Sequence, residues 1–76
     1  MKIELEFLNA RDSLKSRVHD EQLIYNGLVP IPSIGESTLV EDNIWKVLER
    51  HFIYMGPHAI NPEIPDVKVT LWCEEP

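Results

Sequence analysis

IWKVLERHFIYM, residues 44–55, is the stretch that decides the fold, because it is compatible with both a helix and a strand. As a helix it would carry an apolar stripe, and Gly56-Pro57 would end it. Its β-branched and aromatic residues favour a strand instead. The helical stripe would comprise Ile44, Val47, Leu48, His51, Phe52 and Met55, whereas the strand would place Trp45 and Val47 on one face and, after a bulge, alternate through Leu48, Arg50, Phe52 and Tyr54. Spacing alone leaves both interpretations open.

The segment before this arm is punctuated by two prolines and a glycine. Pro30 and Pro32 lack backbone donors, so Val29 to Ile34 is expected to be extended but outside any ladder. Gly35 then allows a turn. Residues 37–40 read as a strand and residues 41–43 as the polar turn that leads into the arm.

Both ends of the chain alternate between apolar and polar residues. Residues 2–8 and residues 66–73 therefore predict strands with one buried face, the second placing Val67, Val69, Leu71 and Cys73 together. Glu74-Glu75-Pro76 is typical of the end of an edge strand. Residues 9–22 are mostly polar and predict a loop with at most one turn of helix, and Gly56 to Pro65 predicts an irregular loop.

A further short strand is predicted at Leu23-Ile24-Tyr25, where Asn26-Gly27 suits a tight turn. From Gly35-Glu36-Ser37-Thr38-Leu39 through Ile44-Trp45-Lys46-Val47 to residues 67–71, the chain resembles short bacterial and phage proteins that form small β-barrels. This resemblance favours the strand at residues 44–55 and transfers no catalytic residue. We therefore expect a mostly β protein, an SH3-like or open barrel of about four to five antiparallel strands. The alternative is an α+β fold with a helix at about residues 39–55 packed on a small sheet.

Length and composition narrow the class of protein. The 76 residues suit a single domain, 1–76, whose small core makes a homodimer plausible. A lone cysteine and no apolar run of the roughly 20 residues that a membrane helix needs predict a cytoplasmic protein without membrane association. Seven basic against thirteen acidic residues give a net charge of −6, which disfavours direct nucleic-acid binding.

No constellation of reactive residues stands out. His19, His51, His58 and Cys73 are the residue types that zinc prefers, but their spacing matches no compact ligand pattern. A nucleophilic pair of Cys73 and His51 would lack a visible orienting group or oxyanion cradle. The glycines stand singly, so no phosphate loop is indicated. We expect no enzyme activity, no metal and no cofactor.

Binding of another protein is the class of function that these observations leave open. Tyr25, Tyr54 and Trp72 are the predicted protein-binding residues, since exposed aromatic side chains are favoured interface anchors. The simpler alternative is that Tyr54 and Trp72 cover a core. Two functions follow: a non-enzymatic interaction module or complex subunit, with strand addition to a partner as one mode, and a phage-type acidic inhibitor that competes for a basic groove of a nucleic-acid-handling protein.

Overall fold

The structure, a computed structural model, describes residues 1–55 and 64–76. Within those ranges it contains only strands and connecting loops, with no helix, so the predicted mostly β fold is confirmed. The segment at residues 39–55 forms a hairpin and not a helix, because its bulky β-branched and aromatic residues suit a pleated surface. The strands are β1 (Lys2–Asn9), β2 (Leu23–Asn26), β3 (Ser37–Val40), β4 (Asn43–Tyr54) and β5 (Val67–Glu74).

The five strands form one sheet in the order β2-β1-β5-β4-β3. Three neighbouring pairs are antiparallel, but β1 and β5 run parallel from Ile3 opposite Val67 to Asn9 opposite Cys73. The expectation of an entirely antiparallel sheet was therefore wrong on this pair. β5 also lies in the centre of the sheet, so its charged end does not mark an edge strand. Alternation of residue types cannot distinguish an edge strand from a central one.

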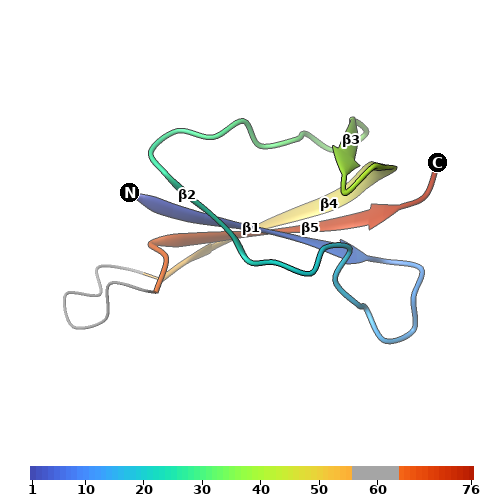
Figure 1. Cartoon of the computed structure of the whole chain (residues 1–76), viewed down its shortest axis with the longest axis horizontal. Helices are drawn as coiled ribbons and strands as arrows, with labels where there is room; N and C mark the ends of the chain where they lie inside the picture. The colour runs from blue at the N-terminus through green and yellow to red at the C-terminus, as the bar shows by residue number, and fades with distance from the viewer. Residues whose placement is uncertain (56–63) are drawn as a thin grey trace.

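The sheet curls into an open half-barrel (Figure 1). Its concave face holds the core. Val47, Val69, Leu71 and Cys73 are completely buried there, and Trp45 is nearly so. The alternation predicted for residues 66–73 is thus confirmed, because its four apolar members all face the core. Residues 27–36, which connect β2 to β3, run between the two ends of the curled sheet (Figure 1). They contain no strand, and Gly35 and Glu36 at their end form backbone hydrogen bonds with Val47 of β4.

A β-bulge in β4 confirms the strand interpretation of the deciding stretch. The register with β5 shifts between Val47 and Glu49, so one extra residue is absorbed at Leu48. Beyond it Arg50, Phe52 and Tyr54 lie opposite residues of β5 that face the core. Without this shift, the second half of β4 would present the opposite face to the core.

Turn residues explain where the hairpin and the β2–β3 connection bend. Glu41 and Asp42 have φ of 49° and 68° and join β3 directly to β4. Positive φ at both central residues is the pattern of the two-residue hairpin turn that matches strand twist. Gly27 and Gly35, with φ of 88° and 91°, occur at the start and near the end of the extended connection.

The polar segment between β1 and β2 is a loop with turns, as predicted, and it contains no helix. It returns alongside the second half of β1: Asn9 N donates to Ser16 O at 2.9 Å and Val18 N donates to Phe7 O at 2.9 Å. The irregular loop predicted at residues 56–65 lies mostly outside the described residues. So does His58, the histidine considered for a metal site.

Candidate functional site

The two hairpin strands β3 and β4 differ greatly in length, and this leaves part of β4 unpaired. β3 pairs with Asn43 to Lys46 only. Just before β3, Gly35 N donates to Val47 O, and Val47 N donates to Glu36 O. On its other side β4 continues along β5 as far as Tyr54. Among the described residues, none pairs with the outer edge of β4 from Arg50 to Tyr54, which we call the open edge.

The backbone groups that face the open edge follow from the ladder on the other side. Met55 N donates to Asp66 O at 2.8 Å, one position beyond the pair Tyr54 and Val67. In an antiparallel strand the hydrogen-bonding groups alternate between the two sides. Arg50, Phe52 and Tyr54 therefore direct their N–H and C=O groups away from β5. Three residues present donors and acceptors in the geometry that an added strand would use.

The side chains at the open edge form a continuous exposed apolar run. Phe52 and Ile53 are each about two-fifths exposed, Tyr54 is 77% exposed and Met55 is 37% exposed. Phe52 and Tyr54 lie on the concave side and Ile53 on the convex side, because their partners in β5 are Val69, Val67 and Lys68. An added strand would thus meet apolar side chains on both faces.

Arg50 fixes one end of the open edge. Its guanidinium lies 5.4 Å from the centre of the Phe52 ring and Nη1 donates to Pro32 O at 3.4 Å. The first contact is a cation–π interaction, which orients the ring. The second ties the strand to the β2–β3 connection. These two contacts hold the Arg50 side chain against Phe52 and against the β2–β3 connection.

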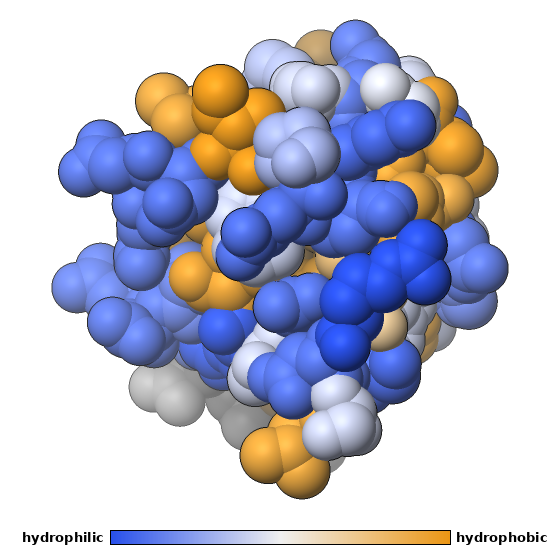
Figure 2. Space-filling view, turned by 90° about the vertical axis from the view of Figure 1, so that its right-hand side faces the viewer, coloured by the Kyte–Doolittle hydropathy of each residue, from blue (hydrophilic) through white to orange (hydrophobic). Residues whose placement is uncertain are grey.

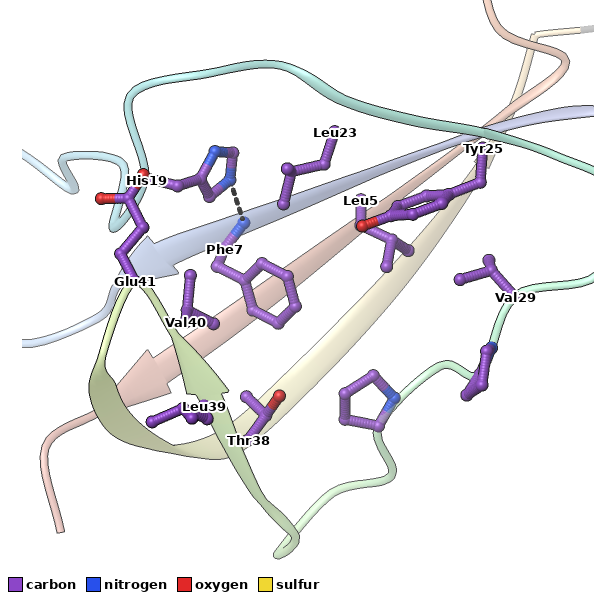
Figure 3. Close-up of a pocket in the computed structure, with 12 residues that line it drawn as sticks. Leu5, Phe7, His19, Leu23, Tyr25, Val29, Thr38, Leu39, Val40 and Glu41 are labelled. Carbon is purple, nitrogen blue, oxygen red and sulfur yellow. Dashed lines mark hydrogen bonds between the residues drawn. The ribbon is translucent and has the colours of Figure 1, made fainter.

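A second feature, a cavity of about 370 Å³, lies in the concave face (Figure 3). Its walls are mostly apolar, with Leu5, Phe7 and Leu23 on the sheet side and Val29 across from them. His19 stands at one end of the cavity, and Tyr25 lies near Leu5 at the other (Figure 3). Such walls indicate packing space or an apolar site, not a reaction centre.

His19 has no free nitrogen for chemistry. Its Nε2 accepts a hydrogen bond from Phe7 N at 3.1 Å, and Nδ1 lies 2.6 Å from Glu21 O. Since a carbonyl can only accept, Nδ1 carries the proton in a neutral ring. The ring also packs edge-on against Phe7. The role that these contacts give His19 is structural: it covers the edge of β1 where β2 has ended.

Cys73 is equally unsuited to nucleophilic chemistry. Its side chain is completely buried, and burial raises the pKa of the thiol to about 11. The thiolate is the reactive form, so a raised pKa makes the group inert near neutrality. Among the described residues, no three His, Cys, Asp or Glu side chains come together as a metal site.

The three aromatic residues predicted to bind a partner do not form one surface. Tyr25 is 39% exposed and lines the cavity, and Tyr54 lies at the open edge on the same concave face. Trp72 is on the convex face, since it pairs with Leu8 and Glu49. There it is half-buried in a hollow with Ala10, Arg11, Lys15, Leu48 and Glu49. Their role as binding residues stays a prediction.

Sequence reasoning missed Arg50, Phe52 and Ile53 as candidate site residues. One signal could have found them: the predicted strand before the turn spans residues 37–40, whereas the returning arm spans residues 44–55. A hairpin with such unequal arms must leave the longer one without a hairpin partner along most of its length.

Comparison of the chain with protein-family models, with curated proteins and with solved structures gives no match. In the described part of the chain, no helix is long and apolar enough to cross a membrane.

Proposed function

We propose that this protein is a non-enzymatic interaction module that binds another polypeptide by adding a strand to the open edge of β4. The observation that carries the proposal is the open edge itself. Arg50, Phe52 and Tyr54 present unpaired backbone groups among the described residues, beside a run of exposed apolar side chains. In strand addition, main-chain hydrogen bonds supply affinity and side-chain contacts supply selectivity.

The physical reason is that an exposed strand edge with unpaired backbone groups promotes unwanted association. Edges in natural sheets are usually blunted by charge, proline, bulges or a covering segment. The open edge contains one cation, Arg50, whose guanidinium is turned to Phe52 and Pro32. Its remaining apolar residues favour association, and their exposure in an otherwise acidic chain is what the proposal explains.

The test compares two proline variants. Phe52→Pro removes a donor that faces the open edge, and proline is tolerated on edges. Ile24→Pro is the matched control and lies in β2, on the opposite edge of the sheet. Gly27 N donates to Met1 O, so the alternation along β2 directs the N–H of Ile24 away from β1. We expect wild type and Ile24→Pro to retain partners from an extract of native cells and Phe52→Pro to lose them.

The site is then mapped by amide hydrogen exchange with the purified partner. The expected result is slower exchange at Arg50, Phe52 and Tyr54 and little change at Ile24 and Asn26. Phe52→Lys is a second variant that keeps the backbone donor and adds an edge charge, and circular dichroism checks that each variant folds. Protection elsewhere, with the three amides of the open edge unchanged, would overturn the proposal.

A second candidate function rests on charge. Asp20, Glu21, Glu41 and Asp42 are all exposed, and Asp20 N donates to Glu41 Oε1 at 3.2 Å, which brings the two pairs together. Among the described residues these four carboxylates form no ion pair. The end of the molecule with the C-terminus and β3 is largely hydrophilic (Figure 2). This arrangement supports the acidic inhibitor of a basic groove as the alternative.

Salt and charge reversal separate the two candidates. We call the surface formed by Asp20, Glu21, Glu41 and Asp42 the acidic end. A partner bound to it should be lost as salt rises, because exposed charges are screened beyond roughly 8 Å at physiological ionic strength. The double variant Glu41→Lys and Asp42→Lys should abolish that capture, and Phe52→Pro should leave it unchanged. Capture that survives salt and charge reversal but not Phe52→Pro would exclude the inhibitor function.

A further inference from the structure

We infer that the strand added to the open edge is β4 of a second copy of this chain, antiparallel, with Phe52 opposite Phe52 of that copy. This inference rests on the proposed function and names its partner. A two-fold axis at Phe52 makes each copy supply the same surface, which is the usual construction of a homodimer. The two half-barrels would then share one continuous sheet.

The backbone favours this register. With Phe52 at the axis, Arg50 lies opposite Tyr54 of the second copy, and the reverse pair follows by symmetry. All three residues direct their N–H and C=O groups toward the open edge, as the Met55 to Asp66 hydrogen bond requires. Each opposed pair can therefore exchange two hydrogen bonds. Every outward group from Arg50 to Tyr54 is satisfied.

The side chains favour it as well. Arg50 would meet the aromatic ring of Tyr54, His51 would meet Ile53, and Glu49 would meet Met55, so no two like charges lie opposite each other. Opposed like charges destabilise a strand pair, whereas a cation over an aromatic ring stabilises it. The sequence around Phe52 is thus complementary to its own reverse.

Registers shifted toward Arg50 lack this complementarity. A shift that places Arg50 opposite Arg50 sets two guanidinium groups against each other. If His51 lies opposite His51, Arg50 pairs with Phe52. Tyr54 then lies opposite none of the three residues whose backbone groups face the open edge. The register centred on Phe52 is the one that uses all three residues and avoids repulsion at the contact.

The net charge of −6 sets the salt dependence of this dimer. Two acidic copies repel each other at long range, and salt screens that repulsion. Self-association through the open edge should therefore strengthen as salt is raised from low to physiological concentration. An attraction between the acidic end and a basic partner would show the opposite trend.

Sedimentation equilibrium over a wide range of protein concentration tests the association. We expect a concentration-dependent monomer–dimer equilibrium for wild type and for Ile24→Pro. Phe52→Pro and Phe52→Lys should weaken the dimer at least tenfold while keeping the β spectrum. A protein that stays monomeric throughout, or a dimer that Phe52→Pro leaves intact, would overturn the inference.

Cysteine cross-linking tests the register. In a Cys73→Ala background, Phe52→Cys should form a disulfide-linked dimer under mild oxidation, because opposed residues of a hydrogen-bonded pair lie about 5.5 Å apart at Cα, within disulfide range. Arg50→Cys mixed with Tyr54→Cys should cross-link as a heterodimer, and either alone should not. A cross-link between Arg50→Cys and Phe52→Cys instead would show a shifted register and overturn the assignment.

The inference and the proposed function can fail separately. If the protein is monomeric but an unrelated partner slows exchange at Arg50, Phe52 and Tyr54, the open edge binds a polypeptide and the second copy is not its occupant. If neither self-association nor a partner changes exchange at these amides, both are wrong.

Discussion

The second half of β1 and the second half of β4 face the same structural problem and meet it differently. In each, the neighbouring edge strand is short: β2 pairs with β1 as far as Leu5, and β3 pairs with β4 as far as Lys46. On β1, Val18 and His19 then fill the vacant edge, with hydrogen bonds to Phe7 O and from Phe7 N. On β4, no described residue does so beyond Val47. In the described part of the chain, the fold therefore covers the edge of β1 and leaves the edge of β4 open, and the proposed strand addition rests on this contrast.

The largest expected effect tests whether a side chain in the half of β4 that pairs with β3 contributes more to the free energy of unfolding than one at the open edge. Trp45, in the half of β4 that pairs with β3, is 7% exposed, whereas Tyr54 at the open edge is 77% exposed. Trp45→Ala should lower the free energy of unfolding by about 3–5 kcal/mol through the cavity it leaves. Tyr54→Ala should stay within about 0.5 kcal/mol, as is usual at exposed sites. Urea unfolding of the monomer measures both.

Equal losses at Trp45 and Tyr54 would mean that the open half is packed in the monomer, which would remove the basis of the comparison. Tyr54→Phe controls for the hydroxyl, and measurement at low protein concentration keeps self-association from adding to the apparent stability.

The covered edge of β1 predicts the second effect. His19 is 4% exposed and accepts from Phe7 N, so His19→Ala leaves a buried donor unsatisfied, at a cost of about 1–3 kcal/mol in unfolding free energy. His51 is the matched control, since it lies in β4 with its side chain 57% exposed beside Glu49. His51→Ala should change stability by less than about 0.5 kcal/mol. Thermal unfolding of both variants checks the contrast, and a similar loss in both would show that His19 does not secure the edge.

The sequence was sufficient for the elements whose residues carry their own pattern. Alternation located β1 and β5, and the turn at Glu41 and Asp42 set the boundary between β3 and β4. The bulge was also predicted, because the apolar positions of residues 44–55 fit a strand only after a change of phase. In these places local chemistry determines local structure.

Long-range pairing could not be predicted in the same way. β1 and β5 are parallel neighbours although the whole chain separates them, and neither shows a residue that specifies the other. The cover supplied by His19 was missed because a single histidine in a polar loop has no pattern. Of the candidate site, Tyr54 was singled out as an exposed aromatic residue. Arg50, Phe52 and Ile53 were missed, because the open edge depends on which strand lies beside β4.

Alkaline pH tests the centre of the sheet, on which both edges depend. Burial raises the pKa of the Cys73 thiol from 9.0 to about 11, so the folded state disfavours the thiolate. A group with a raised folded pKa contributes its full stability below the unfolded value and loses it as pH rises through the folded value. Between about pH 9 and 11 the unfolding free energy should therefore fall by up to about 1.4 kcal/mol per pH unit from this thiol.

Cys73→Ala serves as the control for the thiol, because lysine and tyrosine also titrate at high pH. The variant should keep their contribution and lose the extra slope. In addition, the thiol of the folded wild type should resist a thiol reagent near neutral pH and react after unfolding. Rapid reaction of the folded protein would show that the strands around β5 separate easily.

The smallest expected effect concerns the hairpin tip, at the paired end of β4. Asp42 has φ of 68°, a conformation that glycine adopts without strain, so Asp42→Gly should raise the unfolding free energy by a few tenths to about 1 kcal/mol. Glu41→Gly should gain less, although φ is 49° there, because it removes the carboxylate that accepts from Asp20 N. Chemical unfolding measures both, and a loss in Asp42→Gly would contradict the turn geometry. Asp42→Gly should stabilise the monomer and leave its self-association unchanged. That result would show that the stability of the hairpin does not affect association through the open edge of β4.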